Sequence, residues 1–193
     1  MSTKYELTDE TKNTYGVTLH RIRALRDIPS AGVKSGDLGG WIEKESNLCQ
    51  NDDAWVYGNA RVYGNAEVCD DARVYDDARV YGYAWVFGDA RVYDDARVCS
   101  KARVCGDAEV CGDAKVCGDA DYMTFKNSWS SGRWFTYTRS NKMWKVGCFY
   151  GSGDELIKKA YADSELNGKC YEAIVRAVET IEAAKAEAKG GAK

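Results

Sequence analysis

Alanine recurs at every sixth residue from Ala54 to Ala120 without interruption. Valine follows each alanine two residues later, from Val56 to Val116. The unit reads mainly Ala-x-Val-(Tyr/Cys)-(Gly/Asp)-(Asp/Asn). A fixed short period of this kind is typical of solenoid proteins, and it constrains the fold more than any other feature of the chain.

One hexad has the chemistry of a short strand followed by a bend. Alanine and valine lie two positions apart, so in a strand both side chains point to one side. The Gly/Asp and Asp/Asn positions tolerate left-handed backbone angles and supply the bend. Three bends close a triangular coil of roughly 18 residues, and the coils stack at the strand spacing of ~4.8 Å. We therefore predict a parallel β-helix of about four coils, with a solid core of alanine and valine and no interior cavity.

This unit resembles the left-handed β-helix of the hexapeptide-repeat proteins. In that family an aliphatic residue points inward and a small residue follows four positions later, as Val56 and Ala60 do here. The resemblance covers residues 54–120 and implies a left-handed coil, whereas the general crossover rule favours a right-handed one.

The segments on either side of residues 54–120 lack the repeat. The whole chain is therefore expected to have a mainly β fold in three parts. Residues 1–53 are expected to form an N-terminal β cap and an irregular first turn, with Gly39-Gly40-Trp41-Ile42 and Leu48 in that turn. Residues 54–120 form the β-helix. Residues 121–193 are expected to form an α+β module, because terminal caps cover the exposed edges of a solenoid.

Within the C-terminal module the sequence predicts a β-hairpin and two helices. The strands are expected at 133–138 and 143–149, with a turn at 139–142. One helix opens at Gly153, and a longer one runs from about Lys169 to Lys189.

Both flanking segments resemble proteins of unknown function. The stretch from Lys4 through Gly39-Gly40-Trp41 is similar to uncharacterised enterobacterial and phage hexapeptide-repeat proteins, some of which are labelled acetyltransferases. The run 147–151 followed by Asp154-Glu155-Leu156 resembles a β-β-α-α module of phage and prophage proteins. The resemblance implies a phage setting and no known chemistry.

Residues 18 apart are expected to stack into columns on three outer faces. The first face carries the cations Arg61, Arg79, Arg97 and Lys115 beside Tyr63, Tyr81, Cys99 and Cys117. The second carries Trp55, Arg73, Arg91 and Glu109 beside Tyr57, Tyr75, Tyr93 and Cys111. The third carries Glu67, Trp85, Arg103 and Asp121 beside Cys69, Phe87, Cys105 and Met123.

These aromatic columns have three interpretations. The rings stabilise the coil by stacking on one another, they form a self-association interface, or they bind a foreign partner. The family resemblance implies a homotrimer. The oligomer-interface candidates are Trp55, Tyr57, Tyr63, Tyr75, Tyr81, Trp85, Phe87 and Tyr93.

One corner of the coil is expected to carry stacked carboxylates, from Asp76, Asp77, Asp94, Asp95 and Asp113. The first interpretation is ordinary left-handed turn chemistry. The second is a line of carboxylates that imitates nucleic-acid phosphates, which would make the partner a nucleic-acid-binding protein. If the column of Arg61, Arg79, Arg97 and Lys115 is the contact instead, the partner is acidic; the denser charge favours the corner. A calcium site is a third, minor alternative.

Charge and cysteine content suggest an intracellular chain. The formal net charge is −3, so any electrostatic partner must be recognised by local patches. The N-terminus has no apolar signal-peptide core and no apolar run is long enough to span a membrane, so we expect a cytoplasmic protein.

Because the cytoplasm is reducing, we expect the eight cysteines to be reduced thiols. There is no Cys-x-x-Cys pair, so we expect no metal and no cofactor.

The sequence offers no catalytic constellation. Acyltransferases of this fold use a histidine on the coils as general base, and the one histidine here, His20, lies in the cap. We therefore expect a non-enzymatic interaction protein, which binds a host protein or a small nucleotide signal. In a phage setting it would inhibit a host defence component, as an anti-CRISPR or signal-sequestering protein does. The alternatives are an acyltransferase and a structural spacer.

Overall fold

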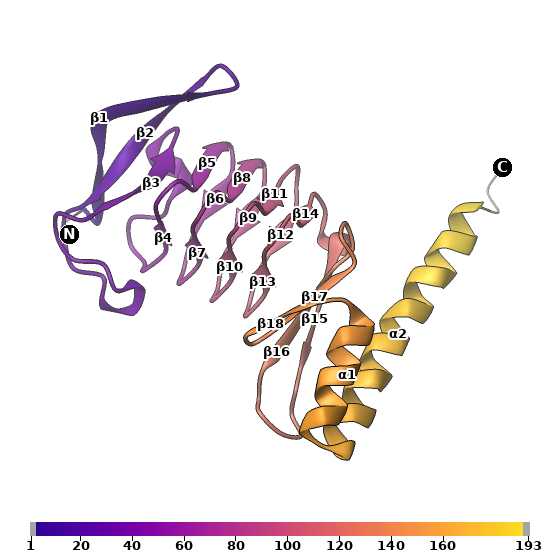
Figure 1. Cartoon of the computed structure of the whole chain (residues 1–193). Coiled ribbons are helices and arrows are strands. Elements are labelled where there is room, and N and C mark those ends of the chain that lie inside the picture. Colours follow the sequence, from indigo (N-terminus) through magenta and orange to yellow (C-terminus); the bar gives the residue numbers. More distant parts are fainter. Residues whose placement is uncertain (1–2, 191–193) are drawn as a thin grey trace.

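The computed structural model describes residues 3–190 and shows a β-solenoid between two different end structures (Figure 1). An N-terminal group of strands lies at one end of the solenoid. A C-terminal module of strands and two helices lies at the other end. No helix among the described residues is long and apolar enough to cross a membrane.

The N-terminal cap is an antiparallel hairpin joined to the solenoid. Strands β1 (Tyr5–Thr14) and β2 (Val17–Ala24) pair with each other, and β2 pairs with β3 (Leu38–Ile42). Strand β3 then pairs in parallel with the first coil, as predicted for the irregular turn. A Cβ on Gly39 would lie 2.6 Å from both Ile22 Cγ1 and Val56 O, so only glycine allows β3 to pack this closely. The short 3-10 helices η1 (Pro29–Ala31) and η2 (Glu45–Asn47) lie in the connecting loops.

The coils form three parallel sheets, which confirms the predicted β-helix. The basic face consists of β5 (Arg61–Gly64), β8 (Arg79–Gly82), β11 (Arg97–Val98) and β14 (Lys115–Val116). The tyrosine face consists of β4 (Trp55–Val56), β7 (Arg73–Val74), β10 (Arg91–Val92) and β13 (Glu109–Val110). The third face consists of β6 (Glu67–Val68), β9 (Trp85–Val86) and β12 (Arg103–Val104).

The interior is made of the repeated alanines and valines. Every valine from Val56 to Val116 is fully buried, and the alanines from Ala54 to Ala114 are at most 1% exposed. Equivalent residues of successive coils pair directly, for example Val74 with Val92. The predicted solid core is confirmed. The left hand of the coil stays a prediction from the family resemblance.

The third face ends one coil earlier than predicted. We expected Asp121 and Met123 to continue its two columns. Instead Asp121 lies in the short 3-10 helix η3 (Asp119–Asp121), and Met123 lies in a strand that pairs antiparallel outside the solenoid.

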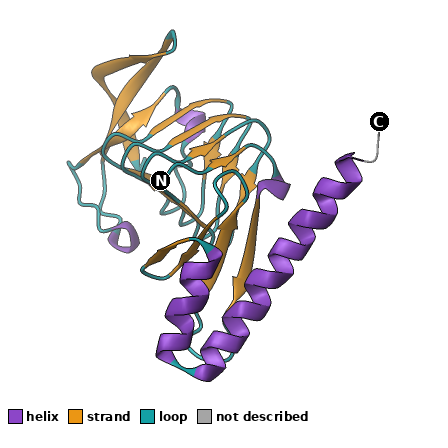
Figure 2. Ribbon diagram, turned by 45° about the vertical axis from the view of Figure 1, so that its right-hand side comes forward, coloured by secondary structure: helices purple, strands orange, loops and turns teal. Residues whose placement is uncertain are grey.

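The C-terminal module has four strands where two were predicted. Strands β15 (Tyr122–Lys126), β16 (Trp134–Thr138), β17 (Met143–Val146) and β18 (Phe149–Gly151) form one antiparallel sheet. Helices α1 (Gly153–Asp163) and α2 (Glu165–Gly190) lie side by side against it (Figure 2). The second helix thus begins four residues before the predicted Lys169. Phe135, Trp144, Tyr171 and Val175 form the shared core of the sheet and helices.

Side chains from both end structures complete the hydrogen bonds of the terminal coils. At the C-terminal end, the Glu109 N–H donates to Thr136 Oγ1 (3.0 Å) and the Lys115 N–H donates to Ser140 Oγ (2.7 Å). At the N-terminal end, the buried Lys4 ammonium donates to the Ala54 carbonyl (2.8 Å). These contacts cover part of the backbone edge of the first and last coils.

Four of the eight cysteines are joined in disulfides, so the expectation that all are reduced is wrong. Cys49 pairs with Cys69, and Cys99 pairs with Cys117. The Cα atoms of the two pairs lie 5.1 and 4.5 Å apart. The reason is the stacking itself, which places equivalent outward residues of adjacent coils within disulfide distance.

Candidate functional site

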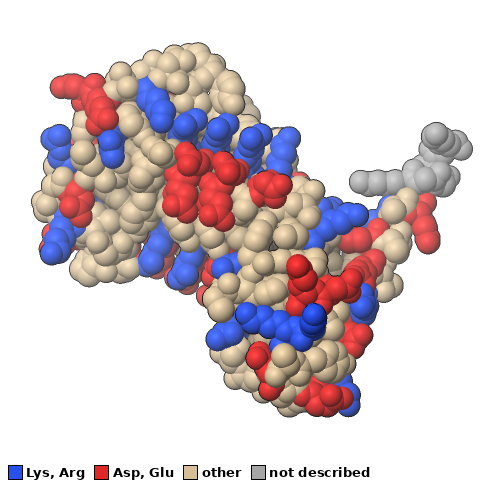
Figure 3. All heavy atoms as spheres, in the orientation of Figure 1, with Lys and Arg blue, Asp and Glu red and all other residues tan. Residues whose placement is uncertain are grey.

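The cationic column of the basic face is in register, as predicted. Arg61 pairs with Arg79, Arg79 with Arg97, and Arg97 with Lys115. Within the described chain, none of the four has a carboxylate oxygen within 4.0 Å. Lys and Arg side chains form a line along the solenoid, visible in Figure 3. Stacked like charges repel, so this column is an energetic cost to the fold.

The column continues onto the cap, which the hexad period alone could not predict. Trp41 of β3 pairs with Arg61, and Arg21 of β2 pairs with Trp41. The Arg21 guanidinium lies 5.5 Å and the Lys12 ammonium 5.2 Å from the centre of the Trp41 ring. We call the set Arg21, Trp41, Arg61, Arg79, Arg97 and Lys115 the basic row. It spans five strand spacings, or roughly 24 Å.

The exposed tip of the hairpin contacts this row. The Arg79 guanidinium donates to the Tyr15 hydroxyl (3.0 Å), and it lies 5.9 Å from the centre of the Tyr15 ring. Tyr15 is 80% exposed. An exposed aromatic ring beside an unpaired cation is a common feature of binding surfaces.

The acidic corner is largely occupied by turn chemistry. Asp76 and Asp94 both adopt φ 56°, the left-handed region. The Asp94 carboxylate accepts from the Gly112 N–H of the next coil (2.9 Å), and the Asp76 carboxylate accepts from the Asp94 N–H (3.4 Å). Asp113 accepts from Asn141 Nδ2 of the C-terminal module (3.0 Å).

Within residues 3–190, Asp77 and Asp95 are the two corner residues whose carboxylates accept no hydrogen bond and form no ion pair. Figure 3 shows acidic side chains gathered beside the line of basic ones. The geometry favours the turn interpretation for Asp76 and Asp94, and all five corner residues remain exposed.

The aromatic columns stack on themselves in part. The rings of Tyr63 and Tyr81 lie parallel at 5.2 Å, and those of Tyr75 and Tyr93 lie parallel at 4.7 Å. Trp85 packs on Phe87 at 4.3 Å, and Trp85 is still 38% exposed. This self-stacking supports the first of the three interpretations.

Trp55 was expected to be an interface residue, and that expectation is wrong. Its side chain is 1% exposed and packs edge-on against Tyr5 of the cap at 6.2 Å. The cap therefore covers the first position of the tyrosine face.

The tyrosine face carries a groove of about 340 Å³, lined by Tyr57, Arg73, Tyr75 and Arg91. A second hollow of about 170 Å³ shares Arg91 and adds residues of the C-terminal module, among them Arg133 and Trp134. Burial raises the pKa of Tyr75 to about 12. Burial also raises the pKa of the neighbouring Cys111 to about 11. These groups are therefore neutral near pH 7.

His20 lies in the N-terminal cap, as expected. It lies half-buried in β2, with Nδ1 3.2 Å from the Thr8 carbonyl oxygen. No other histidine exists in the chain to serve as a base on the coils.

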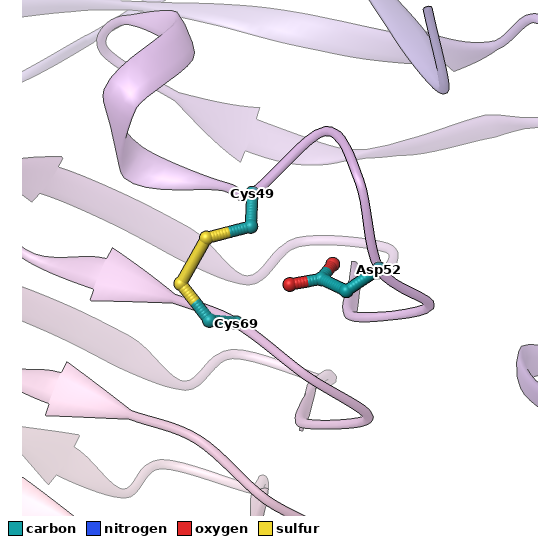
Figure 4. A group of neighbouring side chains, drawn as sticks. All are labelled: Cys49, Asp52 and Cys69. Atoms are coloured by element: carbon teal, nitrogen blue, oxygen red, sulfur yellow. A yellow bond between two sulfur atoms is a disulfide. The ribbon is translucent and has the colours of Figure 1, made fainter. Parts of the chain in front are cut away.

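Cys49, Asp52 and Cys69 form a cluster with the residue types of a metal site (Figure 4). The two sulfurs are bonded to each other. The Asp52 carboxylate accepts from the Lys4 ammonium (2.8 Å) and from the Asp70 N–H (2.6 Å). Every candidate ligand of this cluster is thus engaged in a covalent or polar contact of the fold.

Comparison with known families identifies the type of repeat. A family profile described as the YdcK beta solenoid repeat matches residues 54–70 and 72–88. The repeat is similar to that of YdcK. The match covers two consecutive coils and no part of the cap or of the C-terminal module. No curated protein shows a significant match to the sequence.

Proposed function

We propose that this chain is a non-enzymatic binding protein whose basic row contacts an acidic macromolecular partner. The observation that carries the proposal is the absence of carboxylate partners along four stacked cations in the described structure. The fold bears the cost of this repulsion. An acidic surface lying along the row would remove it.

The rigidity of the scaffold supports the same conclusion. Each cation of the four coils is held on a strand whose neighbours are paired on both sides or capped by the C-terminal module. A pre-organised surface loses little conformational entropy on binding, so its charge spacing contributes to specificity.

The two alternatives have less support. An acyltransferase of this fold needs a histidine on the coils, and the coils have none. A polymerising spacer needs free ends, whereas the described ends are partly covered. A phage origin and inhibition of a host defence component rest on the sequence resemblance of the flanking segments.

Charge reversal of the row tests the proposal. The Arg79→Glu/Arg97→Glu variant should lose the partner captured by the parent protein from nuclease-treated host lysate. The matched control, Asp77→Ser/Asp95→Ser, should retain it. Binding of the identified partner should also weaken as salt rises, because the contact is between charges. Retention by the row variant together with loss by the corner variant would move the contact to the acidic corner.

A further inference from the structure

The groove of the tyrosine face is open to solvent, and contacts from other parts of the chain lie at both of its ends. On the cap side, the Tyr57 hydroxyl donates to the Ala31 carbonyl (2.8 Å), and the Arg73 guanidinium donates to the Ser30 carbonyl. On the module side, the Lys145 ammonium lies 5.8 Å from the centre of the Tyr93 ring. The cap loop thus holds two of the four lining side chains, Tyr57 and Arg73, in place.

The groove carries unbalanced positive charge. Arg73 and Arg91 are register partners on adjacent coils, so their side chains leave the sheet about 4.8 Å apart. Arg91 has one ion pair, with Glu109 at 3.7 Å, and Glu109 is shared with Lys145 at the same distance. Arg73 has no carboxylate within 4.0 Å in the described chain. An oxyanion between the two guanidiniums would accept hydrogen bonds from both and remove their repulsion.

The remaining lining is aromatic. The Tyr75 ring is fixed by its parallel stack on Tyr93, and Tyr57 packs edge-on to Tyr75 at 6.3 Å. These two rings are held in position, and they line the groove beside the guanidiniums of Arg73 and Arg91. A planar ring of a ligand would gain contact area there without ordering flexible side chains.

We propose that this groove binds a small molecule that combines an oxyanion with a planar ring, with the oxyanion between Arg73 and Arg91 and the ring against Tyr57 and Tyr75. Its volume of about 340 Å³ is adequate for a ligand of nucleoside monophosphate size. The site lies on a different face from the basic row, so it stands independently of the proposed function.

Calorimetric titration with dissected probes tests this site. Adenosine 5′-monophosphate and phenyl phosphate carry both chemical parts, adenosine carries only a ring, and ribose 5-phosphate carries only the oxyanion. The two complete probes should bind at least ~10-fold more tightly than either partial probe, a difference of about 1.4 kcal/mol.

Two variants test which side chains bind the oxyanion and the planar ring of the ligand, and a third variant is the control. Arg73→Gln should weaken the complete probes ~10-fold and leave adenosine unaffected. Tyr75→Leu should reduce their advantage over ribose 5-phosphate. Arg103→Gln changes the same hexad position on the third face, and it should bind both probes like the parent. Circular dichroism of each variant should match the parent, and Arg73→Lys replaces Arg73→Gln if it does not.

Two results would overturn the site. One is that neither complete probe binds more tightly than inorganic phosphate. The other is that Arg103→Gln weakens binding as much as Arg73→Gln, which would show general attraction of anions to exposed arginines.

Discussion

At the scale of single residues, inward and outward positions differ sharply in what they tolerate. Val92 is fully buried in a dry interior of alanine and valine. Val92→Asp would place an unpaired charge there, at a cost of at least several kcal/mol. We expect loss of the native circular dichroism spectrum and of cooperative melting. Tyr83→Asp, at a corner position that is 66% exposed, should melt like the parent. A folded Val92→Asp protein would contradict the assignment of the core.

The second prediction concerns the corner aspartates. Replacing one by alanine should destabilise the protein more than replacing it by glycine. Asp94 adopts φ 56° and accepts the Gly112 N–H. Asp94→Ala loses the hydrogen bond and places an alanine in the left-handed region, which costs about 1–2 kcal/mol more than glycine there. Urea denaturation should rank stability as parent, then Asp94→Gly, then Asp94→Ala. The reverse order of the two variants would show that the corner backbone relaxes.

At the scale of elements, the disulfides are the features that differ most from the sequence-based expectation. Counting the free thiols tests them. Unfolded without reductant, the protein should expose four titratable thiols, from Cys105, Cys111, Cys148 and Cys170. Eight thiols would contradict both pairings.

The Cys99–Cys117 link should also contribute to stability. It closes a loop of 18 residues, for which the chain-entropy account gives about 3 kcal/mol. Cys99→Ser/Cys117→Ser should therefore unfold at lower urea concentration than the oxidised parent. When both proteins are measured with reductant, which also breaks Cys49–Cys69 in each, that difference should largely disappear.

The repeat explains why some elements were predictable and others were not. A six-residue period determines the core and the columns, because each position is repeated in every hexad. Strands β15 and β18 have no such repetition, so their alternation is too short to recognise. The basic row was predicted only as far as Arg61, because its extension through Trp41 and Arg21 depends on antiparallel pairing with a hairpin. The groove depends on the contact between Tyr57 and the loop at Ala31, 26 residues earlier in the chain, which no local sequence pattern indicates.

At the scale of the whole molecule, the third face is the best candidate for self-association. Trp85 remains partly exposed beside Phe87, and neither the cap nor the module contributes a strand to this face. We predict a mass above that of one chain by light scattering, with a trimer expected from the family resemblance. Trp85→Ser/Phe87→Ser should lower the mass. A monomer of the parent at tens of micromolar would end this hypothesis.

The arrangement of the ends has a mechanical consequence. The described chain enters at one end of the rod and leaves at the other, so tension between its ends acts along the stacking axis (Figure 1). Hydrogen bonds between coils lie along that axis too, and such bonds break a few at a time, as in a zipper. Under force the solenoid should peel coil by coil. Each step would release 18 residues, or roughly 60 Å of extended chain. The Cys49–Cys69 and Cys99–Cys117 bonds each withhold about one coil of chain from extension, so a reduced molecule should stretch about two steps further than an oxidised one.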